Sequence, residues 1–278
     1  MDLLTRLDLL PMVATELMDY RKLTATATSG DVTYLEDRLN IHQNSDHQIG
    51  SFVVFADGPN KGQVCRVADN NRSAGQLRLA PTPTDPVTAG TEIHQVNLRG
   101  AGFVPAEIYD NMNIALRFAY PEHKHKFTIE VSRFYSHTPY VDLSLDPLIE
   151  GVDALEFYSS SHGWEQAPLS AVEGADGYWV SPYDGRLYVG GDWPGMLDGL
   201  DIRIVAYRPP KLLLDDDAIC EVLPEWLVLD TCYRLLRAGV MRDPQRFTIA
   251  QSIEQRRERL AAAIRTPVTS GQATVRLN

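Results

Sequence analysis

Hydrophobic residues at the start of the chain recur at helical spacing on both sides of Pro11. The apolar positions are Leu3, Leu4, Leu7, Leu10, Val13, Leu17 and Tyr20. Apolar residues three or four apart share one helix face, so this pattern predicts one helix, or two short helices, with an apolar stripe. We therefore expect residues 1–47 to form an N-terminal helical segment. Its stripe needs a partner, because short helices are marginal alone.

Between Gly50 and Val96 the pattern changes to short β-prone runs. The turn clusters that separate them are DGPNKG, DNNRSAG and PTPTDPVTAG. Turn signals every eight to twelve residues, with Val and Ile between them, are typical of a compact antiparallel module such as a small barrel. We assign residues 48–98 to this small β barrel-like module.

A second helical pattern begins at Pro105 and ends before Pro121. One face carries Ile108, Met112, Ala115, Leu116 and Ala119. Proline suits the first turn of a helix and cannot continue its interior, so the two prolines mark the ends. We expect this helix, within residues 99–124, to bury one face and expose the other.

From Lys126 to Arg208 the pattern is again β. The runs are FTIEV, ALEFY, YWV, GRLYVGG and DIRIVAYRP, separated by Gly, Pro, Asp and Ser clusters. They predict an antiparallel sandwich-like insert of six to eight strands over residues 125–210. We expect its inner face to carry Trp179, Leu187, Val189, Ile202 and Ile204.

The last part of the chain, residues 211–278, is predicted to be helical with an extended or flexible tail. A helix begins at Pro224 and is apolar nearly all round, through Leu227, Val228, Cys232, Leu235 and Leu236, with Gly239 as its C-cap. Such a helix should be central. A final helix runs from about Pro244 to Arg265 and carries Phe247, Ile249, Ile253, Leu260 and Ile264.

Together these patterns predict an α+β fold: one helical bundle with two antiparallel β inserts, a small β barrel-like module and a β sandwich-like module. Three consecutive domains standing side by side are the alternative. The bundle is favoured because the first and third helical segments each carry apolar surface that needs a partner.

The net charge of the chain argues against some classes of binding partner. The 278 residues carry a net charge of −11 with a pI near 5.1, which argues against a duplex DNA or anionic membrane binder. Basic residues nevertheless gather from Arg234 onward. Within that segment Arg256, Arg257 and Arg259 fall within about one helical turn and would suit a carboxylate-bearing partner, so we predict an interface there. A solvated basic helix face is the alternative reading.

The three cysteines, Cys65, Cys220 and Cys232, show neither CxxC spacing nor a nearby histidine, so we expect buried, reduced thiols and no metal site. Charged residues interrupt the apolar N-terminus, which argues against a secretion signal. No run approaches the roughly 18 apolar residues of a membrane span. We therefore expect a protein that is made and used in the cytoplasm, with no membrane and no cofactor.

The sequence lacks the common catalytic motifs: it has no Walker loop, no GxGxxG after a strand, no GxSxG and no HExxH. The HKHK run from His123 to Lys126 favours a solvated segment over a metal pair, because its lysines repel a cation. The acids Asp215, Asp216, Asp217 and Glu221 lack the order of a calcium loop, and we expect them to favour the N-terminal dipole of the following helix.

Carboxylate pairs and aromatic residues suggest one enzymatic alternative. Asp142 with Asp146, or Glu156 with Glu165, could serve as the acid and nucleophile of a glycosidase. A sugar platform could be formed by Phe157, Tyr158, Trp164, Tyr178, Trp179, Tyr183, Tyr188 and Trp193. At strand spacing such aromatics more often pack in a core or between subunits, and we favour that reading.

Two stretches resemble the head-to-tail connector proteins of tailed bacteriophages. One is IGSFVVFADGPNKGQVCRVADNNRSAGQLRLAPTPTDPVTAGTEIHQVN followed by the helix with NMNIALRFAYP; the other is IRIVAYRPPKLLLDDDAICEVLPEWLVLDTCYRLLRAG. In that family a DGPNKGQ-type turn and an AGTEIHQ-type strand bracket a small β module, and a strand ending in Tyr-Arg-Pro leads through an acidic linker to a central Pro-initiated helix. The resemblance covers most of residues 48–265.

The resemblance implies a non-enzymatic structural adaptor of the virion, made in the host cytoplasm. It implies a homo-oligomeric ring, commonly twelve-fold, between the portal protein and a tail or nozzle protein, with DNA passing through the lumen. An acidic wall would not trap that polyanion. The alternative functions are a tail-associated glycan-binding protein or glycoside hydrolase, using Trp164, Trp179 and Trp193, and a cellular metabolic enzyme without a known motif.

Overall fold

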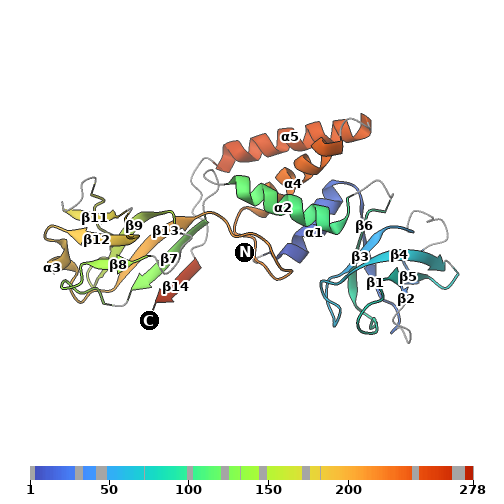
Figure 1. Ribbon diagram of the computed structural model, residues 1–278, viewed down its shortest axis with the longest axis horizontal. Helices are drawn as coiled ribbons and strands as arrows, with labels where there is room; N and C mark the ends of the chain where they lie inside the picture. The colour runs from blue at the N-terminus through green and yellow to red at the C-terminus, as the bar shows by residue number, and fades with distance from the viewer. Residues whose placement is uncertain are drawn as a thin grey trace. The chain divides into compact units, whose positions relative to one another are not determined.

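The computed structural model describes residues 4–28, 34–41, 49–71, 73–98, 103–119, 125–131, 133–143, 149–170, 176–181, 183–239, 244–264 and 273–277. The chain forms two compact units, both of which combine helix with antiparallel sheet, so the predicted α+β class is confirmed (Figure 1). The first unit comprises Met1–Phe118 and Lys211–Thr266, and the second comprises Ala119–Pro210 and Pro267–Asn278.

The first unit opens with helix α1 (Arg6–Glu16), which has a capping box. Asp8 accepts a hydrogen bond from the backbone N–H of Thr5 at 2.8 Å, and the Thr5 hydroxyl accepts one from the N–H of Asp8. These two contacts satisfy amides that a helix start leaves unpaired. Five apolar residues of α1 are buried: Leu7, Leu9, Leu10, Val13 and Ala14.

The prediction that residues 1–47 are helical is wrong beyond α1. The chain there enters β1 (Tyr20–Thr24) and β2 (Tyr34–Glu36), which join the sheet formed by β3 (Phe52–Phe55), β4 (Val64–Asn71), β5 (Gln76–Ala80) and β6 (Glu92–Val96). The strand order is β1-β6-β3-β4-β5-β2, and every pairing is antiparallel. Just after β1, the N–H of Thr26 donates to the carbonyl of Glu36, the last residue of β2, over 2.8 Å. The β module therefore begins near residue 20, not 48.

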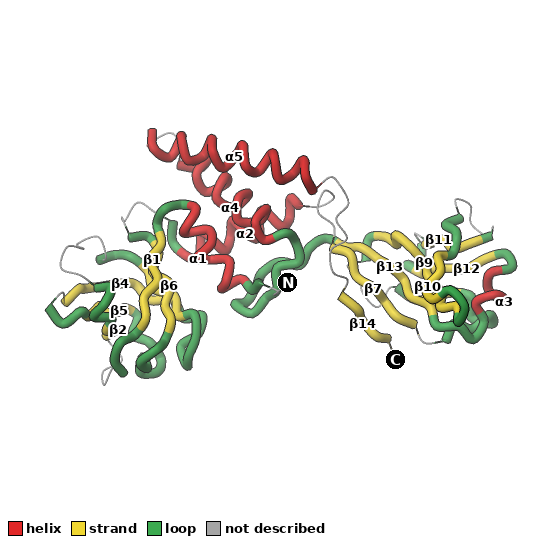
Figure 2. The backbone as a smooth tube through the Cα atoms, turned by 180° about the vertical axis from the view of Figure 1, so that it is seen from behind, coloured by secondary structure: helices red, strands yellow, loops and turns green. Residues whose placement is uncertain are grey.

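Three further helices complete the first unit: α2 (Pro105–Ala119), α4 (Pro224–Gly239) and α5 (Pro244–Ile264). The five apolar positions predicted for one face of α2 are all buried. Helix α4 packs against both α1 and α5, as its predicted central place requires (Figures 1 and 2). Its positions Leu227, Val228, Cys232, Leu235 and Leu236 are buried.

The second unit contains two sheets that share one hydrophobic core. The larger has the order β10-β9-β13-β7-β14, and the smaller the order β11-β12-β8. The strands are β7 (His125–Val131), β8 (Tyr140–Asp142), β9 (Gly151–Ser159), β10 (Gly163–Gln166), β11 (Gly177–Val180), β12 (Arg186–Gly190), β13 (Ile202–Arg208) and β14 (Ala273–Leu277), with the short helix α3 (Trp193–Leu197). Strand β14, in the predicted tail, pairs in parallel with β7.

Strand alternation assigns the inner face of the second unit almost as predicted. Leu187, Val189, Ile202 and Ile204 are buried in the shared core. Trp179 is a correction: its neighbour Tyr178 occupies the core, and Trp179 lies on the other face of β11, stacked on Tyr188 with ring centroids 5.7 Å apart. Successive strand residues point to opposite faces, so only one of the two aromatics can enter the core.

Candidate interaction surface of the helical unit

The three arginines singled out in the sequence have different roles in the structure. Arg256 forms a two-pronged ion pair with Glu16 of α1, at 2.7 and 3.1 Å. Arg257 donates to Asp230 of α4 over 2.7 Å, and its guanidinium lies 4.3 Å above the ring of Tyr233. Arg259 is exposed and has no hydrogen bond or ion pair with any residue that the structure describes. Two of the three therefore hold α5 within the chain, and Arg259 remains available to a partner.

The apolar stripe predicted for α5 is only partly buried. Ile253 is buried, together with Ala250. Ile249 and Leu260 are half-buried, and Phe247 is 49% exposed. We call α1, α2, α4, α5 and the segment of residues 211–223 the helical unit. Ionic contacts through Arg256 and Arg257 thus supplement a narrow apolar contact between α5 and the rest of the helical unit.

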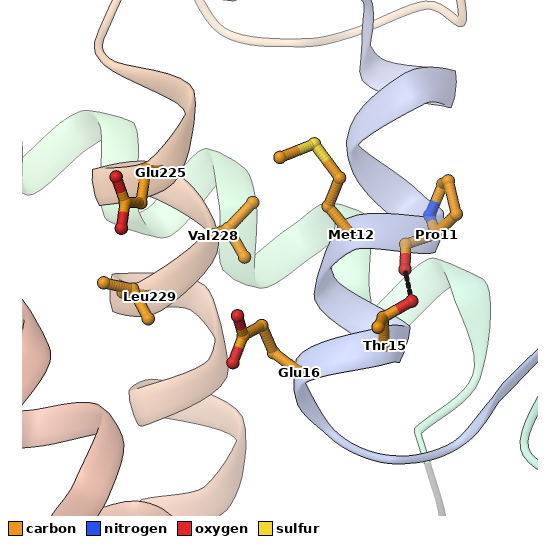
Figure 3. Close-up of a pocket in the computed structure, with 7 residues that line it drawn as sticks. All are labelled: Pro11, Met12, Thr15, Glu16, Glu225, Val228 and Leu229. Carbon is orange, nitrogen blue, oxygen red and sulfur yellow. Dashed lines mark hydrogen bonds between the residues drawn. The ribbon is translucent and has the colours of Figure 1, made fainter.

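An open pocket of about 340 Å³ lies between α1 and α4. We call it the helix groove; it is lined by Pro11, Met12, Thr15, Glu16, Glu225, Val228 and Leu229. Figure 3 shows Met12 and Val228 pointing toward one another from the two helices. The Thr15 hydroxyl donates to the carbonyl of Pro11 over 2.6 Å, so its proton is already used within α1. The groove thus combines an apolar floor with two carboxylates.

The two carboxylates of the helix groove are electrostatically unequal. Glu16 accepts hydrogen bonds from Arg256, and this contact raises the pKa of the Arg256 guanidinium. Glu225, in the first turn of α4, is exposed and makes no hydrogen bond or ion pair with any described residue. Arg256 also acts on Glu225 through its electrostatic field, so one guanidinium serves two carboxylates and the groove retains a net negative charge.

Large apolar side chains are exposed on the helical unit outside the groove. Phe118 of α2 is 71% exposed and Leu214 is 72% exposed. Ile114, Ile219, Leu223 and Phe247 are exposed as well. Single exposed apolar residues are common, and several of them on one unit are candidates for contact with another protein.

Two members of the acidic run at Asp215–Asp217 form ion pairs with distant parts of the chain. Asp216 accepts a hydrogen bond from Arg6 at the start of α1, and Asp217 pairs with Lys61 in the turn between β3 and β4 at 2.6 Å. Glu221 accepts from the backbone N–H of Lys211. The contacts of Asp216 and Asp217 fasten the segment that precedes α4 to α1 and to the β3–β4 turn.

The aromatic residues of the second unit form separate clusters. Trp179, Tyr188 and Tyr140 are cross-strand neighbours on the smaller sheet, with Arg186 stacked over Tyr140. On the larger sheet, Trp164 packs edge-on against Tyr158 under the guanidinium of Arg203, and Trp193 packs edge-on against Phe157. Trp179 and Trp164 thus belong to different sheets.

The carboxylate pairs proposed for a glycosidase are not assembled among the described residues. Glu156 lies opposite Gln166, and Glu165 lies opposite Phe157, in the register of β9 and β10. Adjacent positions of a strand point to opposite faces, so Glu156 and Glu165 cannot flank one bond. Asp146 and His123 lie outside the described residues. The described part contains no cluster of three His, Cys, Asp or Glu side chains arranged for a metal ion.

The predicted burial of the three cysteines is confirmed. Burial raises the pKa of Cys65 and of Cys220 to about 11, and it raises the pKa of Cys232 further. The Cys232 thiol lies within 3.6 Å of the carbonyl of Val13, at the contact between α4 and α1. These thiols are therefore parts of the packing.

The helix groove was missed in the sequence. Its signal is present in each helix separately: Met12 and Glu16 are four residues apart, as are Glu225 and Leu229, so each apolar residue shares a face with a carboxylate. That these two surfaces face one another depends on the tertiary fold, and spacing within one helix cannot predict it.

Within the described part of the chain, none of the helices has both the length and the apolar character needed to cross a bilayer. The chain matches neither the models of known protein families nor the curated proteins with which it was compared.

Proposed function

We propose that this protein is a non-catalytic structural adaptor at the head-to-tail joint of a tailed-virus particle. The observation that carries the proposal is the number of large apolar side chains exposed on the helical unit, led by Phe118, Leu214 and Phe247. Burying such side chains against a neighbour contributes about 1.5 kcal/mol or more for each one covered. In this proposal the helical unit forms the contacts between ring neighbours and with the portal protein.

The order of modules supports the same assignment. We infer that the fold is a helical bundle that carries the six-stranded sheet as a barrel-like module and the two-sheet unit as a sandwich-like module. The sandwich-like module contacts a tail or nozzle protein. The net charge of −11 suits a lumen through which DNA passes without being held, because like charges repel. The proposed assembly is a ring of about twelve copies in the virion.

Mass photometry and negative-stain images of the purified chain, alone and with a portal protein, test the proposal. We expect rings, or a ring seated on the portal. A monomer that binds no portal and retains oligosaccharides would overturn it in favour of the glycan-binding alternative.

A matched set of variants tests whether the helical unit forms the ring. Leu214→Ser and Phe247→Ser remove exposed apolar groups of the helical unit, whereas Tyr183→Ser changes a residue of the second unit that is 91% exposed. We expect the first two to reduce assembly and the third to leave it unchanged. Equal assembly by all three would show that the ring forms through another surface.

A further inference from the structure

The helix groove has two carboxylates, and they differ in their contacts with arginine. At one end, the guanidinium of Arg256 covers both oxygens of Glu16 with two hydrogen bonds. Glu225 at the other side of the groove makes no hydrogen bond or ion pair with a described residue, and Arg256 acts on it only through its electrostatic field. One arginine of the chain therefore lies between two carboxylates, and it donates hydrogen bonds to Glu16 alone.

The chemistry of the groove selects a basic side chain with an aliphatic stem. Met12, Val228 and Leu229 provide the apolar floor, and Met12 is 37% exposed. Arginine buries its methylene stem along apolar surface and keeps its charged head beside polar groups. A guanidinium also matches a carboxylate through two parallel hydrogen bonds, which an ammonium cannot reproduce. An arginine therefore fits the floor and Glu225 together.

We propose that Arg259 of a second copy of this chain occupies the helix groove and pairs with Glu225. This inference rests on the proposed ring. Neighbours in a closed ring meet head to tail, so each copy contributes two different surfaces, one for each neighbour. Among Arg256, Arg257 and Arg259 on α5, the first two have partners within the chain, and Arg259 is exposed without one. The helical unit thus carries both an unpaired acid and an unpaired base.

A charge exchange tests the pairing. Glu225→Arg and Arg259→Glu should each weaken ring formation roughly tenfold or more, because each sets like charges against one another at the interface. The double variant restores the pair with its signs reversed and should recover most of the loss. Arg78→Glu, at an exposed position of β5, is the matched control and should assemble like the unchanged chain.

The outcomes separate this inference from the proposed function. If the unchanged chain forms no ring, either alone or with a portal protein, the proposed function fails. If it forms rings and both single variants also form them, or if the double variant recovers nothing, the Arg259–Glu225 pairing is overturned and the ring stands. Glu225→Gln and Arg259→Gln remove the charges without reversing them, and they decide the question if a reversed variant fails to fold.

Discussion

Arg6, at the start of α1, donates a hydrogen bond to Asp216 over 2.5 Å, although 210 residues separate them in the chain. The same guanidinium donates to the carbonyl of Leu214 over 2.9 Å and lies 4.4 Å above the ring of Tyr109 on α2. The arginine thereby joins two helices to the segment that leads into α4. The pair is mostly shielded from water, so its attraction is less screened than that of a surface ion pair.

Replacing either member of this pair should destabilise the first unit. Arg6→Ala removes three hydrogen bonds or ion pairs and the ring contact, and Asp216→Ala leaves a shielded guanidinium without its counter-ion. We expect each to lower the free energy of unfolding by about 2 kcal/mol. A double-mutant cycle by urea denaturation should give a coupling of about 1 kcal/mol. A coupling near zero would show that the two residues contribute independently.

Gly62 should be sensitive to any side chain because of its distance from Asp216. Its φ is +80°, and a Cβ placed on it would lie 1.8 Å from Oδ2 of Asp216. Gly90 has a similar φ of +90° but open space around it. Gly90→Ala should therefore cost about 1 kcal/mol from backbone strain, and Gly62→Ala clearly more. In an Asp216→Ala background the excess at Gly62 should disappear, and its persistence would place the clash elsewhere.

Charge reversal at the arginines of α5 should lower the free energy of unfolding most where the partner carboxylate is most buried. Arg257→Glu would set a carboxylate against Asp230, whose side chain is only 4% exposed, and should cost about 3 kcal/mol of unfolding free energy. Arg256→Glu faces the more accessible Glu16 and should cost about 1 kcal/mol. Arg259→Glu should stay within about 0.5 kcal/mol. Thermal and urea denaturation of the three variants would contradict this order if Arg259→Glu were the most damaging.

Helix positions followed from sequence spacing because each helix carries its own signal. The α2 face from Ile108 to Ala119 is buried as its periodicity predicts, and Pro224 and Gly239 bound α4. Strands β1 and β2 were missed since YRKLT and YLE are short and polar, and their pairing depends on strands far along the chain. Strand alternation likewise allows two faces for Tyr178 and Trp179, and only core packing decides between them.

The candidate site was less accessible to sequence reasoning. The cluster of basic residues on α5 was visible, but the partner of Arg256 lies 240 residues earlier and that of Arg257 lies 27 residues earlier. Charge spacing along one helix indicates which residues share a face. It does not indicate which cations another part of the chain neutralises, and that distinction is what isolates Arg259.

The three thiols should be unreactive in the folded chain. Burial raises the pKa of Cys65 and Cys220 to about 11, so the reactive thiolate is scarce at pH 8, and both side chains are shielded from reagents. We expect an aromatic disulfide reagent at pH 8 to label no thiol rapidly in the native protein and all three in denaturant. Rapid labelling of one native thiol would indicate local opening around it, and peptide mapping would identify the site.

His94 should make stability depend on pH. It is 6% exposed on β6, its Nδ1 lies 3.1 Å from the Tyr20 hydroxyl, and burial lowers its pKa below the ordinary value of 6.5. The unfolded chain therefore binds the proton first as pH falls. The His94 contribution to unfolding free energy should be constant above about pH 6.5 and decrease below it, by at most about 1.4 kcal/mol per pH unit, until the folded form is protonated. His94→Gln should remove this component between pH 5 and 7 in urea denaturation, and an unchanged slope would assign the pH dependence to other groups.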